Sequence, residues 1–162
     1  MIIRHSESFL ALILLHPKKD QMVVECIITL IQRGFLQTND PGVLISYTNV
    51  ISDPAQKEQA LSTIVIEVAK MGVHTRNRDL LQRAVGLTCL IEGEETRSAT
   101  LTTIIDEATE LAVHDGDLDL LRRMREWSAS LLSRDIETLA IARITEGMIT
   151  RAQLVLIQPY GQ

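Results

Sequence analysis

The chain has 162 residues, of which 46% are hydrophobic and 23% charged, so it suits one folded domain and is not a disordered chain. Its formal charge of −5 argues against a general nucleic-acid binder, because non-specific affinity for phosphates requires a basic surface. Aromatic residues make up only 3% of the chain, so we expect Leu, Ile, Val and Ala to form the core.

Start and stop signals divide the chain into about eight expected helices. The residues expected to cap helix starts are Asp20, Asp40, Asp53, Asn77 and Asp117, and those expected to end helices are Gly34, Gly72 and Gly116. The expected helices cover about 6–15, 21–33, 41–51, 54–71, 78–91, 94–114, 118–132 and 136–157, with a loop at 35–39. Apolar residues recur at helical spacing throughout, and no alternating pattern predicts a strand.

The segment 96–121 repeats the segment forty residues before it, without a gap. The aligned pairs are Leu61 and Leu101, Ile64 and Ile104, Val65 and Ile105, Val68 and Ala108, His74 and His114, Asp79 and Asp119, and Arg83 and Arg123. Forty residues further on, Leu101 and Ile104 align with Ile141 and Ile144. Self-similarity at this period is typical of stacked helical hairpins. We therefore predict an all-α fold, a right-handed α-solenoid of antiparallel helix pairs with a period of about 40 residues.

The predicted solenoid is a single domain covering residues 1–162. Its expected parts are a lead helix at 1–19, hairpins at 20–53, 54–93 and 94–133, a closing helix at 134–158 and a tail at 159–162. The closing helix carries Ile149, Leu154, Leu156 and Ile157, which is a rich apolar content for an exposed end. A possible homo-oligomer would bury this helix against a second copy.

The central hairpin resembles the tetratricopeptide-like helical repeats of archaeal and bacterial proteins of unassigned role. The resemblance rests on Arg97-Ser98, on Leu101, Ile104 and Ala112, and on Gly116-Asp117 before a second helix. The period departs from the 34 residues of true tetratricopeptide repeats and is also similar to that of HEAT or armadillo arrays. The second hairpin has Arg76-Asn77 in place of Gly116-Asp117. The resemblance implies protein–protein binding on a concave surface, which either set of helices could line.

Two groups of side chains are candidate partner-binding residues. Four arginines gather near the third hairpin, and two histidines occupy equivalent turn positions; these residues are Arg122, Arg123, Arg125, Arg134, His74 and His114. The arginines could contact an acidic partner, or they could form a solvated surface that is partly paired along the helix. The histidines could bind a metal beside nearby aspartates, but the sequence around them lacks the further ligands of a zinc site, and solvated turn residues are the simpler interpretation.

Three aspartates, Asp115, Asp117 and Asp119, imitate the start of a calcium loop. Such a loop needs glycine at its sixth position, where this chain has Leu120, so we predict no calcium site. We interpret the acidic runs at Glu94-Glu95 and at 106–110 as the exposed surface of helices, because nothing in the sequence predicts a cleft around them. We predict no catalytic, cofactor-binding or metal-binding residues, since the signatures of nucleophilic, zinc-dependent and nucleotide-binding enzymes are absent.

Two cysteines, Cys26 and Cys89, lie in apolar helical stretches, and their spacing suits neither a disulfide framework nor a metal site. We expect both thiols to be buried and reduced, which favours the cytoplasm. Trp127 takes the place of Leu87 in the repeat and is expected in the core, with an interface hot spot as the alternative. No segment has the about 20 apolar residues that span a bilayer, so we expect no membrane association.

These patterns predict a protein–protein interaction scaffold without catalytic activity, whose partner is another protein of unknown identity. One alternative is an enzyme or small-ligand-binding protein with a pocket inside the superhelix, marked by at least two convergent titratable groups. A second alternative is a nucleic-acid-associated adaptor that uses Arg122, Arg123, Arg125 and Arg134, although the acidic composition argues against it.

Overall fold

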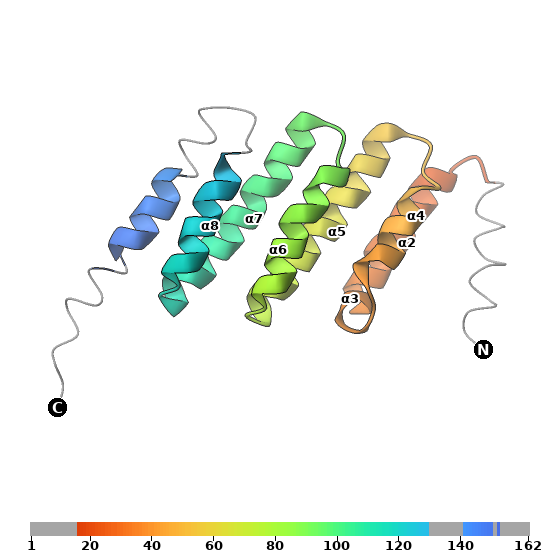
Figure 1. The fold of residues 1–162 in the computed structure, drawn as a ribbon. Coiled ribbons are helices and arrows are strands. Elements are labelled where there is room, and N and C mark those ends of the chain that lie inside the picture. The colour runs from red at the N-terminus through yellow and green to blue at the C-terminus, as the bar shows by residue number, and fades with distance from the viewer. Residues whose placement is uncertain (1–15, 130–140, 151, 153–162) are drawn as a thin grey trace.

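The computed structural model describes residues 16–129, 141–150 and 152, and every regular element in this part of the chain is helical (Figure 1). The helices are α2 (Lys19–Gln32), α3 (Phe35–Thr38), α4 (Pro41–Thr48), α5 (Pro54–His74), α6 (Arg78–Leu87), the 3₁₀ helix η1 (Thr88–Leu90), α7 (Glu94–Asp115) and α8 (Leu118–Ser128). Residues 141–150 are helical as well. The all-α prediction is therefore confirmed. The expected lead helix lies outside the described residues, and so does most of the expected closing helix.

Four of the predicted capping side chains accept backbone N–H groups at the starts of their own helices. The pairs are Asp40 with Gly42, Asp53 with Gln56, Asn77 with Asp79 and Leu80, and Asp117 with Leu120. Each cap satisfies a donor that the first turn of a helix leaves unpaired. Gly34 and Gly116 have the positive φ angles of 78° and 70° expected of left-handed helix ends.

The short helices α6 and α8 lie on one side of the long helices α5 and α7 (Figure 1). Helix α5 packs against α2, α4, α6 and α7, and α7 packs in turn against α8. The core runs continuously through these contacts. Its fully buried large side chains include Ile27, Leu44, Ile64, Leu81, Ile91, Ile104, Ile105, Leu121 and Met124. Burying a side chain of this size stabilises the fold by roughly 1.5–3 kcal/mol before conformational entropy is counted.

The helix at 141–150 packs on α7. Arg143 Nη1 lies 2.5 Å from Asp106 Oδ1, and Ile144 is buried. Gly147 faces Val113 so closely that a Cβ atom at position 147 would lie 2.6 Å from the Val113 side chain. Among the described residues, no helix is both long and apolar enough to cross a membrane.

Several local predictions are wrong because tertiary contacts override them. The expected loop at 35–39 contains the short helix α3, which buries Leu36. Asp20 does not cap its own helix, because its Oδ2 atom accepts the backbone N–H groups of Ser52 and Asp53 at 3.0 and 2.8 Å. Gly72 does not end α5 but lies inside it, buried against α6.

The segment after α6 also differs from the prediction. The α-helix stops at Leu87 and continues as the 3₁₀ helix η1, which has three residues per turn and so changes which side chains face inward. Ile91 is fully buried, whereas Leu90 is 41% exposed. The buried-thiol prediction is wrong for Cys89, which is exposed; Cys26 is half-buried, and this burial raises the pKa of its thiol. Trp127 is buried as predicted.

Candidate functional site

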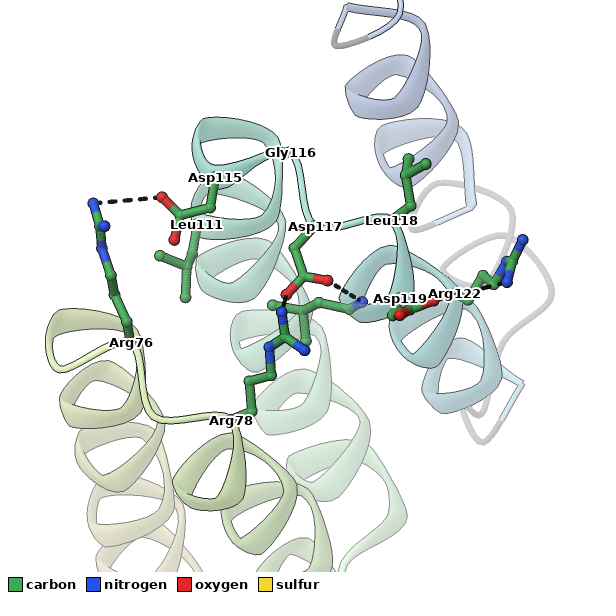
Figure 2. Close-up of a pocket in the computed structure, with 10 residues that line it drawn as sticks. Arg76, Arg78, Leu111, Asp115, Gly116, Asp117, Leu118, Asp119 and Arg122 are labelled. Carbon is green, nitrogen blue, oxygen red and sulfur yellow. Dashed lines mark hydrogen bonds and ion pairs between the residues drawn. The ribbon is translucent and has the colours of Figure 1, made fainter.

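The turn between α5 and α6 and the turn between α7 and α8 together form a hollow that is open to solvent, with a volume of about 650 Å³ (Figure 2). We call it the turn-edge hollow. Its lining residues are Arg76, Arg78, Leu111, Asp115, Gly116, Asp117, Leu118, Asp119, Leu120 and Arg122. Leucines contribute the apolar part of the lining, and arginines and aspartates contribute its polar part.

Two ion pairs cross the hollow from one hairpin to the next, as Figure 2 shows. Arg76 Nη2 lies 3.4 Å from Asp115 Oδ1, and Arg78 pairs with Asp117 through its own Nη2 atom. The Asp117 side chain is only 11% exposed, and its second oxygen accepts the N–H of Leu120 at 3.0 Å. Asp117 therefore both caps α8 and joins it to the preceding hairpin.

Arg76 reaches its partner from a backbone conformation that residues other than glycine rarely adopt. Its φ angle is 53°, and it is the non-glycine residue with positive φ in the described part of the chain. The equivalent position forty residues later is Gly116, which adopts this conformation without a steric cost. The left-handed backbone conformation costs an L-amino acid other than glycine about 1–2 kcal/mol. The arginine therefore occupies a position that favours glycine.

The two predicted histidines lie at the ends of the two long helices, and both are exposed. His114 Nδ1 lies 2.8 Å from Asp115 Oδ1. The pKa of Asp115 is lowered from its ordinary value, first by this hydrogen bond and then by the charges of Arg76, His114 and Arg78. His74 does not line the hollow. His114 does not line the hollow either, and it contacts the lining through Asp115.

The predicted arginine group is divided by the structure. Arg122 lines the hollow with a side chain 77% exposed, and its Nη1 atom lies 3.8 Å from Asp119 Oδ1. Arg123 and Arg125 are exposed on α8 outside the hollow, and Arg134 lies outside the described residues. Within the described ranges, no three His, Cys, Asp or Glu side chains gather as a metal site would require. The carboxylates of the hollow instead face guanidinium groups.

Sequence reasoning missed Arg76 and Arg78, which are the residues that join the second and third hairpins at this edge. Their partners follow them by the same separation, one residue short of the predicted period of forty: Arg76 precedes Asp115, and Arg78 precedes Asp117. Opposite charges at nearly one repeat period were the available signal. It was weak, because exposed charges at such spacings are common in helical proteins.

Carboxylates make a second kind of contact at the opposite edge, where they accept the N–H groups that precede the long helices. Asp20 accepts the N–H groups that precede α5, and Glu58 Oε1 accepts the N–H of Gly93, which precedes α7, at 2.7 Å. The pKa of Asp20 is lowered, chiefly by the hydrogen bond that its carboxylate accepts from the N–H of Ser52. Each carboxylate thus holds the start of the next long helix. The sequence offered no signal for these contacts, because they join residues more than thirty positions apart that only the packed helices bring together.

Comparison with known proteins does not assign the chain. No family model, no curated protein and no solved structure matches it.

Proposed function

We propose that the chain is a right-handed α-solenoid with a period of about 40 residues, and that it serves as a scaffold that binds another protein. The pattern of burial supports the period, because it is the same in residues 61–70 and 101–110. Equivalent turns carry equivalent caps, Asn77 and Asp117. A helix pair of this kind cannot bury its apolar faces alone, so it depends on its neighbours.

The contacts between hairpins are the observation that carries this proposal. Helix α7 packs on α5, and the two edges are joined by Arg78 with Asp117 and by Glu58, which accepts the hydroxyl of Thr96. Such a stack presents extended surfaces and does not need an enclosed cavity. We include in this proposal that the hairpins are tetratricopeptide-like repeats, as the sequence resemblance suggests. An intracellular location fits the exposed thiol of Cys89, since free thiols persist in reducing compartments.

The small-ligand alternative would place a substrate in the turn-edge hollow. The titratable groups there are paired, however: Asp117 with Arg78, and Asp115 with Arg76 and His114. A lowered pKa keeps Asp115 ionised, which does not suit a general acid near neutral pH. The nucleic-acid alternative would use the arginines of α8, where Asp119 and Glu126 dilute the positive charge.

An affinity capture from native lysate, in low and in moderate salt, tests the proposed function. We expect a protein to be recovered in a fixed ratio to the chain at both salt concentrations. Recovery of nucleic acid in low salt alone would replace the scaffold by the nucleic-acid adaptor, because only phosphate binding weakens so steeply with salt. Recovery of the chain by itself would overturn the scaffold. In that case light scattering would measure whether the chain associates with itself. Self-association is reasonable because Ile149, on the helix at 141–150, is an exposed apolar residue.

A further inference from the structure

The outward surface of α6 contains a glycine that the fold itself does not require. Gly86 lies in the helical run formed by α6 and η1, and its φ angle is not positive, so the backbone does not need glycine there. A Cβ atom at this position would meet nothing within 4 Å. Glycine in a helix costs up to about 1 kcal/mol relative to alanine, and no internal contact offsets this cost. A close approach by a backbone outside the chain would account for it.

The side chains around Gly86 form one exposed strip. Four exposed residues lie within about one turn of Gly86, and the members of the strip, which runs from α6 into the 3₁₀ helix η1, are Gln82, Arg83, Gly86, Cys89 and Leu90. Leu90 also lines a small hollow of about 170 Å³, whose apolar members include Ile51, Pro54 and Leu61. The strip therefore has an arginine at one end, an apolar anchor point at the other and an open backbone between them.

Charge separates the two layers of helices. The short helices α6 and α8 carry five arginines and three acidic residues, namely Arg78, Arg83, Arg122, Arg123 and Arg125 with Asp79, Asp119 and Glu126. The long helices α5 and α7 carry three basic and eight acidic residues, namely Lys57, Lys70 and Arg97 with Glu58, Glu67, Glu94, Glu95, Asp106, Glu107, Glu110 and Asp115. In a chain of net charge −5, the short-helix side is thus the side that attracts acidic groups.

Arginine donors remain available on this side. Arg83 uses Nη2 to donate to both carboxylate oxygens of Asp40, at 2.9 and 2.7 Å. A guanidinium has five N–H donors, so the contact with Asp40 does not exhaust it. Arg123, the repeat counterpart of Arg83, is exposed and forms no ion pair with any described residue. Both arginines can donate to carboxylates of a partner.

We propose that the outward surface of α6, together with Arg123 of α8, the next short helix, binds an amphipathic acidic helix of a partner protein. This inference rests on the proposed scaffold function and names its partner class. A partner helix can approach Gly86 closely because no side chain intervenes, and its apolar residue packs on Leu90. Leu90 follows Arg83 by seven residues, or roughly 12 Å along α6 and η1. The partner helix therefore presents an apolar residue and a carboxylate about two turns apart on one face.

A nucleic acid fits this surface less well. Sequence-tolerant binding of single strands uses aromatic side chains on which bases stack. The aromatic side chain in the described parts of α6 and α8 is Trp127, which is buried. An apolar anchor point beside Leu90 likewise has no counterpart in phosphate recognition. The surface thus offers what an acidic peptide needs and lacks what a single-stranded nucleic acid uses.

Fluorescence anisotropy with defined probes tests the proposal. The first probe is a labelled peptide of about 20 residues, long enough to form a helix, built from Glu, Ala and Leu with Leu and Glu on one face. The second has Lys in place of Glu, and the third is a single-stranded oligodeoxynucleotide of similar length. We expect the Glu peptide to bind the wild-type chain and to compete with the captured partner. Preference for the Lys peptide or for the oligonucleotide would overturn the inference.

Two variants locate the binding surface. Gly86→Gln should weaken the Glu peptide at least about tenfold while raising the thermal midpoint, because Gln is a better helix former than Gly, and this gain excludes unfolding as the cause. The double variant Arg83→Glu with Arg123→Glu should weaken binding by a similar or larger factor. Arg33→Glu is the matched charge control, since Arg33 is exposed at the end of α2, and it should leave the affinity unchanged. Equal affinity of wild type and Gly86→Gln would overturn the proposed surface.

Lysate capture with the same variants separates this inference from the function on which it rests. Loss of the captured protein from the Gly86→Gln chain would support both. Equal capture by wild type and Gly86→Gln would keep the scaffold function and overturn this surface. If the wild-type chain captures no protein, the scaffold function fails, and the anisotropy measurement still decides whether the surface binds acidic helices.

Discussion

Two glycines in consecutive helices should respond in opposite directions to the same substitution. Gly72 lies buried in α5, where an added Cβ atom would lie 3.0 Å from Leu81 N, 3.1 Å from Leu81 Cγ and 3.2 Å from Asn77 O. Two of these three atoms are backbone atoms: Leu81 N lies in α6, and Asn77 O lies in the tight turn that Asn77 closes by donating its N–H to Gly72 O at 2.8 Å. Gly86 has no such neighbours. The first site should resist an extra methyl group, and the second should accept it.

The magnitudes follow from two opposing effects. Replacing glycine by alanine inside a helix stabilises it by up to about 1 kcal/mol. Forcing a methyl group into a packed site costs typically about 1–3 kcal/mol, because neighbouring atoms must move. Gly86→Ala should therefore gain up to ~1 kcal/mol, whereas Gly72→Ala should lose about 0–2 kcal/mol. In a domain of this size, each kcal/mol corresponds to a shift of roughly 2–4 °C in the thermal midpoint.

Urea and thermal unfolding followed by circular dichroism at 222 nm measure both variants side by side. The helix-propensity gain is common to the two substitutions, so the difference in unfolding free energy between them isolates the contact of α5 with α6. The position equivalent to Gly72 in the next hairpin is Ala112, which is fully buried, so the next hairpin accommodates a methyl group at this position. An equal gain for Gly72→Ala and Gly86→Ala would show that α6 does not approach α5 as closely as described, and the argument would fail.

Three further predictions concern backbone strain, pH and thiol exposure. The Arg76→Gly and Arg76→Ala variants both lose the contact with Asp115, but only glycine adopts the left-handed φ angle of 53° without strain. Arg76→Gly should therefore be the more stable of the two by about 1 kcal/mol in urea unfolding. Equal stability of the two variants would refute the backbone strain at position 76. The pKa of Asp20 is lowered in the folded chain, chiefly by the N–H of Ser52, so its contribution to stability is present at neutral pH and is lost as the pH falls through the ordinary carboxyl range. Wild type should accordingly lose its advantage over Asp20→Asn when unfolding is measured between about pH 5 and pH 3, and a difference that stays constant with pH would contradict this assignment. Exposed Cys89 should react with a thiol reagent faster than half-buried Cys26, whose pKa is raised by burial. The Cys89→Ser variant should therefore lose the fast phase of the labelling reaction. Survival of that phase would place the accessible thiol at Cys26.

Local chemistry made much of the secondary structure predictable from the sequence. Asp40, Asp53, Asn77 and Asp117 cap the expected helices because a short side chain and the N–H groups it accepts lie within three residues of each other. Gly116 ends α7 for an equally local reason, since glycine takes the left-handed conformation without a steric cost. The apolar stripes of α5 and α7 likewise identified the buried face of each helix before any neighbour was known.

The candidate site was predictable only in part. The arginine group and the turn histidines were visible in the sequence, but which arginine faces the turn-edge hollow depends on where two turns meet. Arg122 lies in the hollow and Arg123 does not, although they are adjacent in the chain. Arg76 and Arg78 acquire their partners only because a second hairpin stacks beside them.

Packing between helices also explains the local predictions that were wrong. Asp20 carries a side chain suited to capping its own helix, yet it accepts the N–H groups of Ser52 and Asp53, which the fold brings against it from more than thirty residues away. Gly72 has the sequence features of a helix end but serves as the point where α6 approaches α5. The sequence by itself thus determined helix starts, helix ends at Gly116 and the buried stripe of each long helix, because these depend on interactions within a few residues. The tertiary structure alone decided the contacts between hairpins and the composition of the hollow, because they depend on the distances and angles at which neighbouring helices pack.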